Sequence, residues 1–186
     1  MQKALCAVST PGIPTLLFGA LPCTGGSPYQ FLNWHLGPKT RAKIRHRRAL
    51  FRVLWRNFVV VADACRANGG QVAFEWPRGC TYWREVKVKS FLKRSAMQTY
   101  AFDGCMYGLR SQRPRAEGKL LRKPWCIAAT SDAFQRLCRK CCHDPKQHAK
   151  VEGSDTKLTE SYTDELAHGI ISCSISALTG DATTTA

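Results

Sequence analysis

Residues 39–67, KTRAKIRHRRALFRVLWRNFVVVADACRA, carry the clearest helical pattern in the chain and decide its fold. Apolar residues recur at spacings of three and four between Ile44 and Val61, which places them on one face of a helix. Pro38 before the pattern and NGG at 68–70 after it are start and stop signals. We therefore predict a single long helix over residues 39–67.

Short apolar runs lie on both sides of this helix and predict strands. Residues 15–21, TLLFGAL, come before it, and residues 71–76, QVAFEW, come after it and end at Pro77. Two further strands are predicted over 99–102 and 124–130, and three further helices over 83–95, 132–141 and 159–177. Because strands alternate with helices, the sequence predicts an α/β fold with a largely parallel sheet and flanking helices.

The length and composition fit one domain with a short appendage. The chain has 186 residues, of which 44% are apolar, so it can bury a core and global disorder is excluded. No run of 18 apolar residues occurs, which excludes an ordinary membrane-spanning helix. We divide the chain into an N-terminal extension (1–14), an α/β core (15–130), a helical part that contains Cys and His (131–178), and a disordered tail (179–186).

Positive charge is concentrated in most of the chain. The net charge is +15, and residues 1–150 hold 27 Lys and Arg against 7 Asp and Glu. Residues 39–56 alone hold eight basic residues and no acidic one. Such a field attracts polyanions, so DNA or RNA is the expected partner. A solvated basic face that coats a core helix is the alternative. The predicted nucleic-acid contacts are Arg41, Arg45, Arg48, Arg52 and Lys123.

The chain contains ten cysteines, several of them inside apolar runs, where a free thiol packs as a small hydrophobic group. The first residues make a poor secretory signal, because Pro11, Gly12 and Pro14 interrupt the apolar stretch. We therefore expect an intracellular protein, in the nucleus or cytoplasm, with mostly reduced thiols and no membrane partner.

A cysteine follows the first predicted strand. In PCTGGS, residues 22–27, Cys23 enters a glycine-rich turn at the carboxyl end of that strand, the edge where α/β folds collect ligands and catalytic groups. Nearby positive charge would stabilise its thiolate and make it a nucleophile. A structural cysteine in a turn is the alternative.

A carboxylate occupies the corresponding place after the next strand. Glu75 lies in FEWPRG, residues 74–79, where burial would raise its pKa and let it donate a proton. Pairing with Arg78 or another arginine is the alternative. Farther along, FDGCMYGL at 102–109 and LRKPW at 121–125 have the residue types of a rim that contacts bases or phosphates.

In this order and spacing, these segments resemble the second half of the DNA cytosine-carbon-5 methyltransferases. The family's Pro-Pro-Cys-Gln-x-Phe-Ser is similar to LPCTGGS at 21–27, and its Glu-Asn-Val stands where Glu75-Trp76-Pro77 stands here. Its Ala-x-x-Tyr-Gly-Val-Pro-Gln resembles CMYGL at 105–109, followed by the RKPW segment at 122–125. The set looks closest to methyltransferase-like segments of protist retrotransposon polyproteins and covers residues 15–130.

The resemblance implies a partial Rossmann-like methyltransferase sheet and a role for three residues. Cys23 would attack carbon 6 of a flipped cytosine, Glu75 would steady ring nitrogen 3, and Arg122 would contact the rim. The cofactor would be S-adenosylmethionine. Because the family's Phe-x-Gly-x-Gly loop is missing, we expect an upstream cofactor-binding segment and a domain that is inactive alone. The chain departs from the family in lacking Asn-Val after Glu75.

Zinc ligands are predicted near residue 140. The segment CRKCCHDPKQH, residues 138–148, combines thiols and imidazoles at spacings that suit tetrahedral Zn²⁺, with Cys138, Cys141, His143 and His148 as the expected ligands. A structural tail is the alternative. The leading hypothesis is thus a nucleic-acid-associated, methyltransferase-like domain of a retroelement-type polyprotein. A non-enzymatic, zinc-stabilised nucleic-acid-binding module is the second, and a decayed element without selected function is the third.

Overall fold

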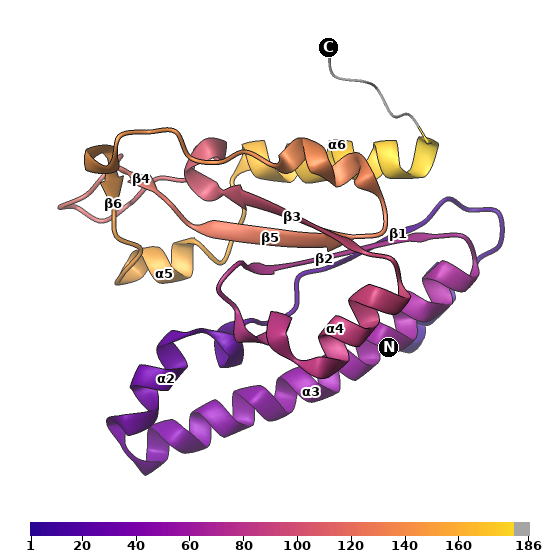
Figure 1. Cartoon of the computed structure of the whole chain (residues 1–186), viewed down its shortest axis with the longest axis horizontal. Helices are drawn as coiled ribbons and strands as arrows, with labels where there is room; N and C mark the ends of the chain where they lie inside the picture. Colours follow the sequence, from indigo (N-terminus) through magenta and orange to yellow (C-terminus); the bar gives the residue numbers. More distant parts are fainter. Residues whose placement is uncertain (181–186) are drawn as a thin grey trace.

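A four-stranded mixed sheet lies between two layers of helices in the computed structural model, which describes residues 1–180 (Figure 1). The strand order is β1-β2-β5-β3. The α/β class is therefore confirmed. The bounds are β1 Leu16–Gly19, β2 Gln71–Pro77, β3 Gln98–Asp103 and β5 Pro124–Ala129.

The prediction of a largely parallel sheet is wrong for two of the three strand pairings. Strand β1 pairs with β2 in parallel, but β5 is antiparallel to both β2 and β3. The reason lies in residues 104–123, which join β3 to β5 without the crossover helix that a parallel connection needs, so β5 returns antiparallel beside β3. Strands β1, β2 and β3 still run in one direction. Their carboxyl ends share one edge of the sheet with the start of β5.

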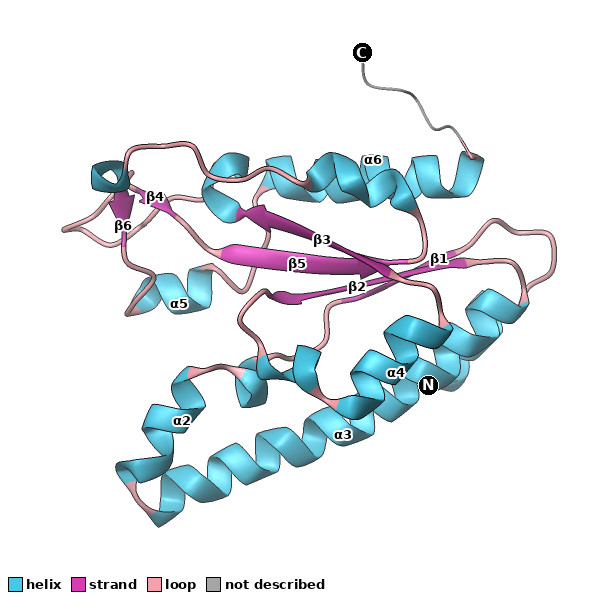
Figure 2. Ribbon diagram, in the orientation of Figure 1, coloured by secondary structure: helices cyan, strands magenta, loops and turns pink. Residues whose placement is uncertain are grey.

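The long helix predicted from the sequence is confirmed as α3 (Pro38–Ala67), which covers one face of the sheet together with α4 (Val86–Arg94) (Figure 2). Helix α1 (Gln2–Val8) packs against α3. The aromatic residues Phe51, Trp55 and Phe58 of α3 pack edge-on or tilted against Phe74 and Trp76 of β2. Gly19 permits this approach, because a Cβ there would lie 2.7 Å from the Phe58 ring. Burial of these large rings is the main stabilisation of this layer.

Helix α6 (Asp164–Thr179) covers the opposite face and closes a second core (Figure 2). It begins later than the predicted 159–177 helix, because the Thr163 hydroxyl accepts a hydrogen bond from the Leu166 amide, at 3.2 Å, and caps it there. The helix predicted over 132–141 is a short 3-10 helix, Asp132–Leu137. Its Phe134 and Leu137 pack into this second core.

Smaller elements lie at one end of the sheet. Helix α2 (Tyr29–Asn33) and the beginning of α3 extend away from the sheet (Figure 1). At the same end of the sheet, β4 (Leu120–Leu121) and β6 (His148–Ala149) form a small parallel pair near α5 (Ser154–Leu158). Helix α6 includes Thr179, and the rest of the predicted tail from residue 181 lies outside the described residues. Within residues 1–180, no helix combines the length and apolar character needed to cross a membrane.

Candidate functional site

Glu75 lies near the carboxyl end of β2. Successive side chains of a strand point to opposite faces of the sheet. Phe74 and Trp76 face the α3 layer, so Glu75 faces the other side of the sheet. There its Oε2 accepts a hydrogen bond of 3.0 Å from the hydroxyl of Tyr162. The residue is only 8% exposed, and Oε1 is buried without a hydrogen-bond partner. Glu75 therefore presents one fixed and one unsatisfied oxygen.

Cys23 is held just beyond β1 by contacts that reach the loop from three directions. The indole of Trp76 donates to the Leu21 carbonyl (2.9 Å), and the Arg48 guanidinium donates to the Gly25 carbonyl (3.3 Å). Gly26 lies against Tyr82 and Cys80, so closely that a Cβ at this position would be 2.7 Å from the Cys80 sulfur. The glycines are thus needed for packing. The loop positions a partly buried thiol at the carboxyl edge of the sheet.

Lys123 completes a strand-end cluster that we define as Cys23, Glu75, Lys123 and Tyr162. It directly precedes β5, so the antiparallel strand brings its side chain to the same edge. Its ammonium group donates to the Thr159 carbonyl and lies 4.9 Å from the centre of the Trp125 ring. The cluster therefore contains a thiol, a carboxyl, an ammonium group and a phenol.

The members of this cluster lie within electrostatic reach of one another. Burial raises the pKa of the Cys23 thiol; the nearby Glu75 carboxylate raises it further, while the Lys123 ammonium opposes this effect. Burial also raises the pKa of Glu75, although the Tyr162 hydrogen bond and Lys123 both act in the opposite direction. The pKa of Lys123 is lowered by its own burial, against the attraction of Glu75 and Cys23. Neutral forms of the thiol and carboxyl are thereby favoured.

Arg122, the predicted rim contact, points toward a different carboxylate. Its Nε lies 3.5 Å from Oδ2 of the buried Asp103, at the end of β3. The adjacent Lys123, predicted as a nucleic-acid contact, is the cation that lowers the pKa of both Cys23 and Glu75. The alternative partner for Glu75, Arg78, makes no ion pair with it among the described residues.

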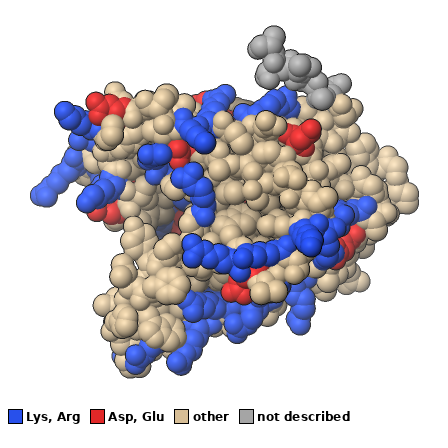
Figure 3. All heavy atoms as spheres, in the orientation of Figure 1, with Lys and Arg blue, Asp and Glu red and all other residues tan. Residues whose placement is uncertain are grey.

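The basic helix α3 exposes most of its charge. Arg45 and Arg52 are exposed, whereas Arg41 and Arg48 are partly buried. Arg45 lies over the Trp34 ring, 5.5 Å from its centre, and Arg48 supports the Cys23 loop. Within the described part of the chain, no Lys or Arg of residues 39–56 forms an ion pair. Figure 3 shows Lys and Arg side chains gathered on the side of the molecule formed by α3 and α4, and also at the end that carries β4 and β6.

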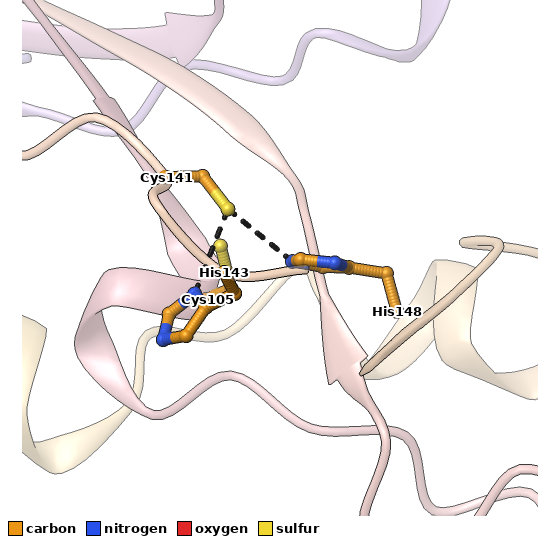
Figure 4. Close-up of side chains that lie close together, drawn as sticks. All are labelled: Cys105, Cys141, His143 and His148. Carbon is orange, nitrogen blue, oxygen red and sulfur yellow. Dashed lines mark hydrogen bonds between the residues drawn. The ribbon is translucent and has the colours of Figure 1, made fainter. Parts of the chain in front are cut away.

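A second cluster contains Cys105, Cys141, His143 and His148, and these four residues could hold a metal ion (Figure 4). One ligand atom of each residue lies within 4.8 Å of all the others. Three of the four predicted zinc ligands are thus brought together. Cys138 is not among them, because it follows the 3-10 helix and lies beside the backbone of Ala101 in β3. Cys105, from the turn after β3, occupies the fourth position.

Comparison with known proteins gives no family or structural relative: no protein-family model, curated protein or solved structure matches the chain.

Two residues of these clusters are not predicted by the sequence patterns. Tyr162 precedes α6 and lies 87 positions from its partner Glu75, so no local pattern links the two. Cys105 belongs to the FDGCMYGL segment, and its spacing of 36 positions from Cys141 is outside the compact zinc motifs that sequence patterns capture.

Proposed function

We propose that this chain is a nucleic-acid-binding, methyltransferase-like domain whose strand-end cluster receives a single base, and that it is inactive alone. The observation that carries the proposal is the placement of Cys23 after β1 and of Glu75 near the end of β2, at the carboxyl ends of two adjoining parallel strands and near enough for Glu75 to raise the pKa of the Cys23 thiol. The ends of such strands are where α/β folds bind ligands. The resemblance to the second half of the cytosine-carbon-5 methyltransferases names the same two residues.

The chemistry of Glu75 suits a heterocyclic base. Its raised pKa lets the carboxylate take up a proton as a base binds, and the protonated carboxyl then donates a hydrogen bond to a ring nitrogen that carries a lone pair. The unsatisfied Oε1 gains a partner when a base binds, which relieves the cost of burying an unpaired polar atom. Because Oε1 is enclosed in the free protein, the groups that cover it must move aside for the base to reach it.

The raised pKa of the Cys23 thiol supports the proposal that the domain is inactive alone. A thiol whose pKa is raised carries little thiolate at neutral pH, and the thiolate is the nucleophile. The glycines beside it do not form a cradle for S-adenosylmethionine, since the space at Gly25 and Gly26 is filled by Tyr82, Arg47 and Cys80. We therefore derive no methyl transfer from these residues, and an upstream cofactor-binding segment stays part of the proposal.

The exposed arginines of α3 support nucleic acid as the polyanion. We expect a labelled DNA duplex to bind with an affinity that falls steeply as salt rises. Replacing Arg45, Arg52 and Arg56 by Gln should lower the slope of log K against log salt by about 0.9 for each phosphate that is no longer neutralised, about 3 in all. The matched control replaces three exposed basic residues near β4 and β6, Arg115, Lys119 and Lys150, and should leave the slope nearly unchanged. The proposal that α3 binds nucleic acid would be overturned if DNA affinity did not change with salt concentration, or if the two triple variants changed the slope equally.

A second measurement tests the base-receiving cluster. A saturating duplex with a mispaired cytosine, which is easily unstacked, should slow the alkylation of Cys23, whereas a fully paired duplex should protect it less. Peptide mapping by mass spectrometry follows Cys23, and the exposed Cys6 is the internal reference.

The second candidate function is a non-enzymatic nucleic-acid-binding module stabilised by zinc, and the cluster of Cys105, Cys141, His143 and His148 favours it. This candidate shares the salt-dependent binding but predicts that no DNA changes the reactivity of Cys23. Equal alkylation of Cys23 with and without saturating DNA would therefore decide for it and against the leading proposal.

A further inference from the structure

We infer that Cys105, Cys141, His143 and His148 bind one structural Zn²⁺, and that this ion holds the turn after β3 in the position that places Lys123 beside Cys23 and Glu75. The metal site stands on its own geometry. Its consequence for the strand-end cluster rests on the function proposed above.

Two separations between ligand atoms already match the edge length of a zinc tetrahedron. The Cys141 sulfur is 3.5 Å from Nδ1 of His143 and 3.4 Å from Nε2 of His148 (Figure 4). Tetrahedral zinc with Zn–S bonds of about 2.3 Å and Zn–N bonds of about 2.0–2.1 Å separates a sulfur from a nitrogen by about 3.6 Å. The buried Cys105 sulfur lies within 4.8 Å of the other three atoms. Two thiols and two imidazoles are the ligand types that zinc prefers at such a site.

Contacts outside the four ligands orient two of them. Nδ1 of His148 lies 3.1 Å from the Asp144 carbonyl, so a proton on Nδ1 is donated there and the Nε2 lone pair faces the Cys141 sulfur. Hydrogen bonding of the second imidazole nitrogen is the usual support of a metal-bound histidine. The Cys141 amide donates to Oδ2 of Asp103 at 2.9 Å, which fixes the backbone of this ligand. The loop that carries Cys141 and His148 is therefore also held by hydrogen bonds from outside the four ligands.

The ion would join three segments that are separate in the sequence. Cys105 follows β3, Cys141 and His143 lie in the loop after the 3-10 helix, and His148 begins β6. Four protein ligands leave no open position, which is typical of a structural rather than a catalytic zinc. A hollow of about 530 Å³, lined in part by His143, Arg110 and Gln147, borders the site and gives the ion an entry path.

Backbone contacts connect the proposed ion to the strand-end cluster. Gly104, next to Cys105, donates its amide to the Lys123 carbonyl at 2.8 Å, and the Asp103 amide donates to the Arg139 carbonyl at 3.0 Å. Asp103 also contacts Arg122, the residue before Lys123. A metal that fixes residues 103–105 therefore fixes the start of β5 and the position of the Lys123 ammonium group.

The first test measures zinc in the full chain purified without chelators. Elemental analysis should find one Zn²⁺ per chain, and replacement of Cys105 or Cys141 by Ser should reduce it to well below one. The matched controls are Cys138→Ser, which alters the remaining ligand predicted from the sequence, and Cys142→Ser, which alters an exposed neighbour. Both controls should retain one zinc. A chain without zinc, or a variant series in which Cys138 is needed and Cys105 is not, would overturn the assignment.

A second test uses the unaltered protein, so that it does not depend on variants that fold poorly. Removing zinc with a chelator should expose Cys141 to alkylation, and adding zinc back should protect it, with Cys142 reacting in both states as the reference. Substitution of Co²⁺ should give the visible absorption of a tetrahedral thiolate site. Identical alkylation of Cys141 with and without zinc would contradict the site. These readouts use no nucleic acid, so a failure of the proposed function leaves them unaffected.

Discussion

Tyr162 donates a hydrogen bond of 3.0 Å to Oε2 of Glu75 and thereby links the segment before α6 to the carboxyl end of β2. The phenol is held in place by edge-on contacts with Phe18 and Trp125, whose ring centres lie 6.5 and 6.1 Å away. One oxygen of Glu75 therefore has a rigid structural partner, while Oε1 has none. The Glu75 carboxyl group is therefore buried in the protein interior and still has one oxygen that can accept or donate a further hydrogen bond.

The reactivity of Cys23 should report the two opposite charges beside it. Glu75 raises the pKa of this thiol and Lys123 lowers it. At pH 8, Glu75→Gln should therefore increase the alkylation rate of Cys23 by about twofold or more, because the thiolate fraction rises. Lys123→Met should decrease that rate. Both rates are measured by timed alkylation and peptide mapping.

The exposed Cys6 serves as the control in the same samples, and its rate should be the same in all three proteins. If Cys23 reacts equally fast in the two variants, the groups are not coupled, and the strand-end cluster loses its chemical basis.

Glu75 should also make the stability of the protein depend on pH. Its pKa is raised above the usual 4.5 by burial, so the folded state holds the proton more tightly than the unfolded chain does. The stability that this group contributes is fully present below its unfolded pKa and is lost as pH rises through the folded pKa. The difference in unfolding free energy between Glu75→Gln and the unaltered protein should therefore increase, in favour of the variant, as pH rises above the unfolded pKa of about 4.5.

Urea denaturation across this pH range measures that difference. Tyr162→Phe provides a matched comparison, because it removes the hydrogen bond that lowers the pKa of Glu75 and should enlarge the loss of stability at neutral pH. If the free energies of unfolding of Glu75→Gln and the unaltered protein differed by the same amount at all pH values, the pKa of Glu75 would not be raised by folding.

The loop that holds Cys23 should not tolerate a side chain at Gly26. A Cβ at this position would lie 2.7 Å from the Cys80 sulfur and 2.8 Å from the Tyr82 ring. Overpacking of this kind costs about 1–3 kcal/mol, so Gly26→Ala should lower the free energy of unfolding by that amount. Gly79→Ala is the control, because its Cβ would meet only Pro28, at 3.6 Å, and should change stability by less than about 0.5 kcal/mol. Equal stabilities of the two variants in urea titrations would contradict the packing described for this loop.

Local patterns predicted the elements that depend on short-range chemistry. The helix over 39–67 agrees with α3 to within one residue, because its apolar period, Pro38 and the following glycines act within the segment itself. The strand over 71–76 agrees with β2 for the same reason. The order of β5 and β3 depends on how residues 104–123 return to the sheet, and periodicity contains no information about that path.

Residue types at short spacing are enough to predict the amphipathic helix, the strand ends that carry Cys23 and Glu75, and three of the four residues of the Cys/His cluster. The three-dimensional fold was needed to see that β5 runs antiparallel, that Lys123 rather than Arg122 lies near Glu75, and that Cys105 rather than Cys138 joins the cluster. Each of these outcomes depends on contacts between residues distant in the sequence, and such contacts are set by how the two cores pack against the sheet.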